Sequence, residues 1–176
     1  MATNKRIAIL ATHGFEQSEL EGPLDGLRNA GFHVDVVSLE AGEIKGWKDK
    51  DWGNTVPVDV VLANASMENY DALVLPGGVF NPDTLRTNPE AVAFVQACDR
   101  AGKPLAAICH APWLLAESGA AKGRKLTSWP SLRTDMENAG AHWEDSEVVV
   151  DGHIVTSRKP EDVPAFNRAV IDLLSE

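Results

Sequence analysis

The stretch Pro104-Leu105-Ala106-Ala107-Ile108-Cys109-His110-Ala111-Pro112-Trp113-Leu114-Leu115 decides the predicted fold, because it reads as a strand, a sharp turn and a helix. Residues 105–108 form a short apolar run behind a Gly-Lys-Pro turn, which is typical of a buried parallel strand. Residues 111–117 carry two leucines at helical spacing, and Gly119 follows as a stop signal. The polar pair Cys109-His110 therefore lies where the strand meets the helix.

Small residues flank this junction two positions away on either side, at Ala107 and Ala111. A nucleophile elbow needs this arrangement, because its central side chain occupies a strained turn. The nearby helix N-terminus carries partial positive charge, which favours a thiolate. A free cysteine behind an apolar run is often simply buried packing. The spacing alone leaves both interpretations of Cys109 open.

Length and charge limit the class of protein. The chain has 176 residues, enough for one domain with a real core, so we expect a single domain over residues 1–176. The net charge is -10 and no basic cluster is present, which argues against nucleic acid or an anionic membrane as a partner. The N-terminal residues lead straight into a strand, with no signal peptide or membrane-spanning run. The two cysteines cannot form a disulfide framework, so we expect a cytoplasmic protein.

The rest of the chain alternates strands with helices. This order predicts an α/β fold with a mostly parallel sheet covered on both faces. Gly22-Pro23 should break or bend the first helix. Cys98 falls on the apolar face of a helix and is expected to be core packing. Strands are expected at 6–11, 33–39, 58–62, 72–75, 126–128, 148–150 and 153–156, helices at 18–30, from 89, at 131–139 and at 164–174, a hairpin or irregular excursion at 40–57, and a loop at 79–87.

Three features fall at the ends of predicted strands: the turn before Glu16 and Glu19, the pair Gly77-Gly78, and Cys109-His110. Ligands of open parallel sheets bind beyond the carboxyl ends of the strands, so these features should converge. Acidic residues in a first helical turn are commonly dipole partners, and that alternative stays open for both glutamates.

Metal and dinucleotide signatures are missing from the sequence. The five histidines, at positions 13, 33, 110, 142 and 153, show no metal-ligand spacing, and Gly77-Gly78 lacks the pattern of a nucleotide-binding loop. We therefore expect no metal and no cofactor.

Five motifs together resemble one family. They are Phe15-Glu16-x-x-Glu19, Ala72-Leu73-Val74-Leu75-Pro76-Gly77-Gly78, Ala107-Ile108-Cys109-His110-Ala111-Pro112, Leu126-Thr127-Ser128 and Val148-Val149-Val150-Asp151-Gly152. In this order they resemble the PfpI branch of the DJ/ThiJ/PfpI superfamily over nearly the whole chain. The resemblance implies a flavodoxin-like, class I glutamine amidotransferase-like three-layer sandwich.

The resemblance also implies roles for individual residues. Cys109 would be the nucleophile, His110 its neighbouring base, and Glu19 the acid that hydrogen-bonds the sulfur. The backbone amides of Gly78 and His110 would form an oxyanion hole. A third carboxylate comes from a second subunit in this family, and Asp83 matches its position, where relatives commonly have Glu. The implied assembly is a homodimer or a larger homo-oligomer.

An ionised Glu19 beside the sulfur would repel a thiolate. We therefore predict that the pKa of Glu19 is raised, so that it keeps its proton, and that the pKa of Cys109 is depressed.

Two functions remain open at this point. The first is a cofactor-free, stress-response cysteine hydrolase acting on a small molecule or a peptide. Family substrates include dicarbonyls and glycated amines as well as peptides, and we favour the small dicarbonyl class. The second is a non-catalytic oxidative-stress role, as a sensor, scavenger or chaperone, in which peroxide oxidises the same cysteine.

Overall fold

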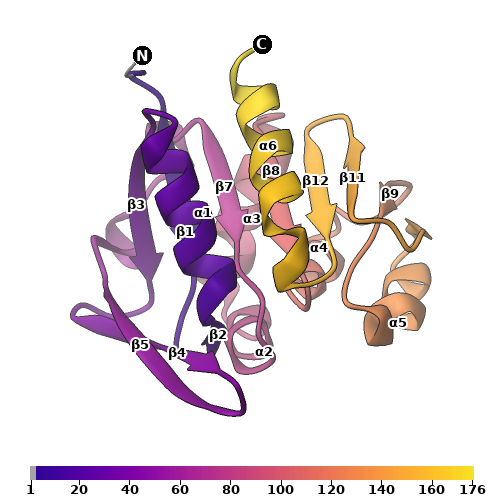
Figure 1. The fold of residues 1–176 in the computed structure, drawn as a ribbon. Coiled ribbons are helices and arrows are strands. Elements are labelled where there is room, and N and C mark those ends of the chain that lie inside the picture. Colours follow the sequence, from indigo (N-terminus) through magenta and orange to yellow (C-terminus); the bar gives the residue numbers. More distant parts are fainter. Residues whose placement is uncertain (1–2) are drawn as a thin grey trace.

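A seven-stranded sheet forms the centre of the computed structural model, which describes residues 3–176 (Figure 1). Every neighbouring pair of strands in this sheet is parallel except β11–β12. The predicted α/β class with a mostly parallel sheet is confirmed. The strands in spatial order are β11 (Val148–Asp151), β12 (Ile154–Ser157), β8 (Leu105–Ile108), β7 (Ala72–Leu75), β1 (Arg6–Leu10), β3 (His33–Ser38) and β6 (Val60–Val61).

Helices cover both faces of the sheet (Figure 1). On one face α1 (Gln17–Asn29) packs against α6 (Val163–Leu174). On the other face α4 (Pro112–Ser118) packs against α2 (Phe80–Arg86) and α3 (Pro89–Arg100). Smaller elements join them: α5 (Arg133–Asn138), β9 (Lys125–Leu126), β10 (His142–Trp143), and the 3₁₀ helices η1 (Leu62–Asn64), η2 (Met67–Asn69), η3 (Pro130–Leu132) and η4 (Pro160–Asp162).

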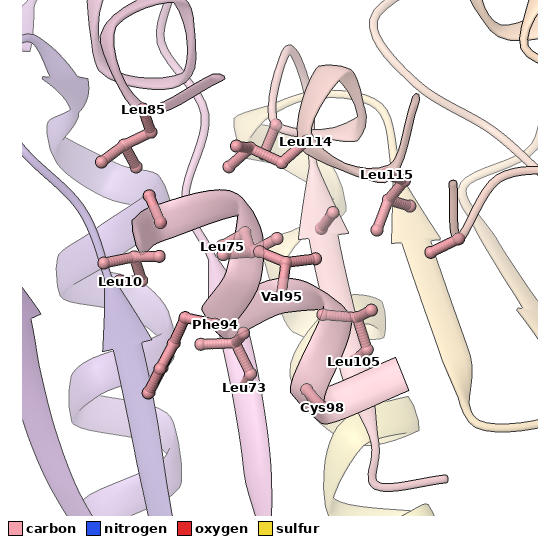
Figure 2. Close-up of a cluster of buried hydrophobic side chains, with 14 of the residues drawn as sticks. Leu10, Leu73, Leu75, Leu85, Phe94, Val95, Cys98, Leu105, Leu114 and Leu115 are labelled. Atoms are coloured by element: carbon pink, nitrogen blue, oxygen red, sulfur yellow. The ribbon is translucent and has the colours of Figure 1, made fainter. Parts of the chain in front are cut away.

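The core has one apolar cluster on each face of the sheet, because successive strand residues point to opposite faces. Figure 2 shows the cluster under α3 and α4, where leucines of β1, β7 and β8 meet Phe94, Val95, Leu114 and Leu115. Cys98 lies fully buried in this cluster, so the prediction that it is core packing is confirmed.

Residues 40–57 form a hairpin rather than an irregular excursion. Its strands β4 (Glu43–Lys48) and β5 (Asp51–Pro57) pair antiparallel, and β2 (Phe15–Glu16) pairs with β4 to complete a three-stranded sheet. The hairpin lies at the end of the molecule where the parallel strands finish (Figure 1). It therefore covers the edge at which the sequence places its candidate site.

One prediction about local structure is wrong, and one alternative of a second is wrong. Residues 79–87 are not a loop, because Phe80–Arg86 forms α2. Pro82 is tolerated in the first turn of α2, because backbone N–H groups in a first turn have no carbonyl acceptor within the helix. Gly22-Pro23, expected to break or bend the first helix, does not break α1, which runs without interruption from Gln17 to Asn29. Gly22 lets α6 approach closely, since a Cβ at this position would lie 2.7 Å from Cγ1 of Val163.

No helix within residues 3–176 combines the length and the apolar character that crossing a membrane requires.

Candidate active site

Cys109 occupies the turn between β8 and α4 with a φ of 66°. Such left-handed backbone costs a non-glycine residue about 1–3 kcal/mol and persists only where the surroundings hold it. Two hydrogen bonds do so: the N–H of Cys109 donates to the carbonyl of Ser157 at 3.0 Å, and its carbonyl accepts from the N–H of Trp129 at 2.8 Å. Cys109 lines the cleft that is described below.

His110 lies directly beside the sulfur, with 3.1 Å between its Nδ1 atom and the Sγ atom of Cys109. Burial lowers the pKa of His110, so the imidazole is neutral at neutral pH and its Nδ1 can accept the thiol proton. The ring stacks on Trp129, with centroids 5.8 Å apart, and meets the edge of Trp113 at 5.3 Å. These two indoles fix the orientation of the imidazole.

Glu19 reaches the same point from the first turn of α1 and is fully buried. Its Oε1 atom accepts a hydrogen bond from the N–H of Gly77 at 3.1 Å, and its Oε2 atom has no hydrogen-bond partner among the described residues. Burial, with a smaller contribution from the charge of Glu16, raises the pKa of Glu19 to about 8. The predicted raised pKa is confirmed, and Glu19 keeps its proton at neutral pH.

The predicted low pKa of Cys109 is wrong for this chain. Burial raises the pKa of the thiol, and the negative charge of Glu19, when ionised, raises it further. The backbone amides of Gly78 and His110 point at the sulfur and oppose this rise only in part. The site therefore holds a neutral thiol at rest, and a base must remove its proton as the sulfur reacts.

Two glycines after β7 allow these groups to meet. A Cβ on Gly77 would touch Oε1 of Glu19 and lie 2.7 Å from Cβ of Cys109. Gly78 has a φ of 81°, and a Cβ there would lie against the carbonyl oxygen of Gly14. Only glycine fits at either position.

Asn81 holds this glycine turn, a role that the sequence did not predict because residues 79–87 were expected to form a loop. The side chain is fully buried at the start of α2. Its Nδ2 donates to the carbonyls of Pro76 and Gly77 at 2.9 and 3.1 Å, while its Oδ1 accepts from the N–H of Thr12 at 2.8 Å. A buried asparagine four residues beyond Gly77 thus fixes the turn that presents the Gly78 amide.

These groups line a cleft of about 470 Å³. The hairpin contributes a wall that the sequence analysis did not anticipate, and Trp129 forms another part of the lining. The tryptophans in the otherwise polar segment 40–57 were the feature of the sequence that could have predicted this wall. The lining residues are Glu16, Glu19, Trp47, Asp49, Lys50, Gly78, Val79, Cys109, His110, Trp129 and Pro160.

The sequence as a whole matches the DJ-1/PfpI family over residues 5–173. The chain belongs to the DJ-1/PfpI family. It is 44% identical to Deglycase TK1284 of Thermococcus kodakarensis over 169 residues, which cover 96% of this chain and 99% of that protein. It is 43% identical to General stress protein 18 of Bacillus subtilis over 173 residues, which cover 98% of this chain and 99% of that protein.

Solved structures of DJ-1/PfpI proteins share the fold. The crystal structure of Drosophila melanogaster DJ-1beta superposes with a TM-score of 0.89 at 30% identity, covering 100% of this chain and 92% of that one. The flavodoxin-like arrangement expected from the sequence is therefore confirmed, and the names of deglycase relatives indicate hydrolase activity within the family.

Asp83, the expected third carboxylate of this DJ-1/PfpI chain, lies on α2 with its side chain exposed. Within residues 3–176 no hydrogen bond joins His110 to a carboxylate, so one chain does not bring Asp83 and His110 together. Its role from a second subunit stays a prediction. The same residues contain no set of three His, Cys, Asp or Glu side chains placed to hold a metal ion.

Proposed function

We propose that the protein is a cysteine-dependent hydrolase that acts, without a cofactor, on small reactive dicarbonyls or on amines modified by them. One observation carries the proposal: the Sγ atom of Cys109 lies on a strained turn, 3.1 Å from a neutral imidazole, in a cleft that also receives the Gly78 amide. The relatedness to a deglycase at 44% identity supports the same chemistry.

The first step is addition of sulfur to an aldehyde carbon. His110 takes the thiol proton as the new C–S bond forms. The carbonyl oxygen gains negative charge toward the amides of Gly78 and His110, then takes up that proton to give a hemithioacetal. If the aldehyde is already bound to an amine as a hemiaminal, sulfur instead displaces the amine, the C–N bond breaks, and the proton leaves on the amine.

The remaining steps release an acid. A proton moves from the sulfur-bearing carbon to the adjacent carbonyl carbon, and the hydroxyl proton moves to the oxygen of that former carbonyl, which converts the hemithioacetal into a thioester of a hydroxy acid. Water then attacks the thioester, the C–S bond breaks, and the thiol regains its proton. Glu19 stays neutral throughout, because an ionised carboxylate here would oppose every negative charge that develops on sulfur or oxygen.

The size and chemistry of the site favour this function over two others. A cleft of about 470 Å³ suits a small ligand, whereas a peptidase must also bind the chain on either side of the scissile bond. A peroxide sensor needs a stable thiolate, and the raised pKa of Cys109 disfavours one. Both cysteines are free thiols, which is consistent with a protein that functions in a reducing compartment such as the cytoplasm.

The proposal includes a second copy of the chain. Asp83 is exposed on α2, close in sequence to Val79 and Phe80, whose apolar side chains are about half exposed. An exposed apolar surface of this kind is suited to self-association. We infer that a homo-oligomer buries it and directs Asp83 toward His110 of the neighbouring subunit.

Lactate formation from methylglyoxal tests the proposal. Reduced wild-type protein and Cys109→Ser are each incubated with methylglyoxal, and in parallel with casein and a fluorogenic peptide. Lactate from wild type but not from Cys109→Ser supports the proposal. Cleavage of peptide without lactate contradicts it in favour of a peptidase. Silence in both assays, with rapid sulfinic mass gain at Cys109 under peroxide, contradicts it in favour of the redox role.

A further inference from the structure

The segment that joins β12 to α6 lies against the turn of the nucleophile at two points. It follows Ser157, whose carbonyl accepts the hydrogen bond from the N–H of Cys109 at 3.0 Å. It also contains Pro160, which lines the cleft together with Cys109. A group that fixes this segment therefore acts both on the backbone of Cys109 and on a wall of its cleft.

One buried ion pair closes this segment upon itself. Asp162, at its far end, is only 2% exposed. The Oδ2 atom of Asp162 accepts hydrogen bonds from the backbone N–H and the Nε of Arg158, both at 3.0 Å, and its Oδ1 atom accepts from Nη2 at 3.1 Å. A carboxylate that binds a guanidinium through both oxygens fixes the geometry of the pair as well as its charge. The two ends of the segment are thereby held in one arrangement.

The carboxylate of Asp162 serves this pair rather than the helix that it precedes. Asp162 is the N-cap residue of α6, a position where an aspartate commonly accepts hydrogen bonds from the free N–H groups of the first turn. Its side chain forms no such bond within residues 3–176. Helix capping therefore does not account for this aspartate, whereas its three contacts with Arg158 do.

The side chain of Ser157 does not hold its own carbonyl in place. Its hydroxyl is buried and has no hydrogen-bond partner in the part of the chain that the structure describes. The position of the carbonyl depends on the pairing of Ser157 with Ile108 and on the segment that follows. Val163, the next residue after Asp162, lies close to Gly22 of α1, the helix that carries Glu19. A displacement of Asp162 would therefore be transmitted to the turn of the nucleophile.

We propose that Asp162 is a positioning residue for Cys109, acting through Arg158 and the carbonyl of Ser157. It keeps the sulfur in its buried position beside His110 and does not itself touch the substrate. This inference rests on the role that the proposed function gives to Cys109. Loss of the pair would release the turn, so that the sulfur becomes more exposed and leaves the imidazole.

Alkylation of Cys109 by iodoacetamide tests the inference without turnover. The reagent is uncharged, the sulfur displaces iodide from it, and intact mass records the thioether that forms. Cys109→Ser reports any alkylation elsewhere. Lactate formation by the same samples gives kcat and KM, and circular dichroism shows that each variant is folded at the assay temperature.

Two variants break the pair in different ways, and one matched control leaves it intact. Asp162→Asn keeps the shape of the side chain but removes its charge and one acceptor oxygen. Arg158→Lys keeps a positive charge beside Asp162 but cannot bind both oxygens in one plane. The control is Asp145→Asn, which removes the exposed carboxylate that accepts from Nη1 of Arg158 at 2.9 Å.

We expect Asp162→Asn to be alkylated about tenfold faster than wild type near neutral pH, because a more exposed thiol has a pKa nearer its ordinary value. Its kcat should fall about tenfold with a smaller change in KM, because the sulfur loses its place beside His110. Arg158→Lys should change both rates in the same directions, and Asp145→Asn should change neither.

Alkylation rates and kcat at the wild-type values in folded Asp162→Asn and Arg158→Lys would overturn the inference, even if both variants melt at a lower temperature. Equal changes in Asp145→Asn would overturn it as well, because the charge near Arg158 would then matter rather than the buried pair. If Asp162→Asn does not fold, Arg158→Lys decides. Absence of lactate from wild type would overturn the proposed function alone, because alkylation does not depend on turnover.

Discussion

The Oε1 atom of Glu19 accepts a hydrogen bond from the backbone N–H of Gly77 at 3.1 Å, just beyond the end of β7. In a protonated carboxyl group the oxygen that accepts is the carbonyl oxygen, so the proton resides on Oε2. The Oε2 atom has no hydrogen-bond partner among the described residues, and the side chain of Glu19 lines the cleft. Glu19 therefore presents a donor to the reacting atoms while the chain holds it in place.

The pKa of Glu19 predicts how stability depends on pH. The folded-state pKa is raised to about 8 from an ordinary value of 4.5, so the stabilising contribution is complete below about pH 4.5 and is lost as pH rises to about 8. The expected loss is at most roughly 1.4 kcal/mol for each pH unit in that window. Denaturant titrations at pH 5 and pH 8 should show a larger loss for wild type than for Glu19→Gln. Equal losses would contradict the assignment.

Replacing Gly78 by alanine should remove activity and destabilise the fold by about 2–4 kcal/mol, because the new Cβ would lie against the Gly14 carbonyl at a φ of 81°. Gly102→Ala is the matched control: Gly102 also has a positive φ, of 66°, but nothing lies within 4 Å of its added Cβ. That control should cost only about 1 kcal/mol and keep full activity. Chemical denaturation and lactate formation measure both effects, and equal behaviour of the two variants would contradict this account of the turn.

Local pattern predicted the strand at Leu105–Ile108 and the position of Cys109 at the following turn, because both depend on neighbours in sequence. It failed at Phe80–Arg86, which was expected to be a loop and forms a helix. Asn81 in the first turn of this helix accepts a hydrogen bond from the N–H of Thr12, and only the fold brings these two segments together.

The pKa of Cys109 was mispredicted for a related reason. A helix N-terminus and a following histidine are visible in the sequence and favour a thiolate. The burial that outweighs them is long-range, because it depends on packing between segments far apart in the chain. Trp129 was missed likewise, since it lies twenty positions after Cys109, whose carbonyl accepts a hydrogen bond from the Trp129 N–H.

Trp129 should act as a positioning residue for His110, whose ring it stacks against at 5.8 Å. Trp129→Ala should lower kcat about tenfold with a smaller change in KM, because the imidazole loses its fixed orientation toward the sulfur. Trp129→Phe should restore most of kcat, since a smaller aromatic ring can still stack. The acidic limb of the kcat/KM pH profile should move in the alanine variant, as the exposed imidazole regains a more ordinary pKa. An unchanged profile with lower stability would assign Trp129 a structural role only.

Asp83 should act across subunits, so two inactive variants should rescue each other. Cys109→Ser and Asp83→Ala are mixed in equal amounts, unfolded and refolded together. If dimers form at random, the mixture should recover about a quarter of wild-type activity, because half the dimers are hybrids with one intact site. No recovery, or a monomer by light scattering, would remove Asp83 from the mechanism.

The central claim is that a neutral carboxylic acid, Glu19, faces the sulfur of Cys109. Infrared difference spectroscopy against Glu19→Gln measures it most directly, because a protonated carboxyl group has a carbonyl band that its carboxylate lacks. We predict that the Glu19 band is present at pH 6 and disappears with a midpoint of about 8. A band already absent at pH 6 would show an ionised Glu19 and contradict the account.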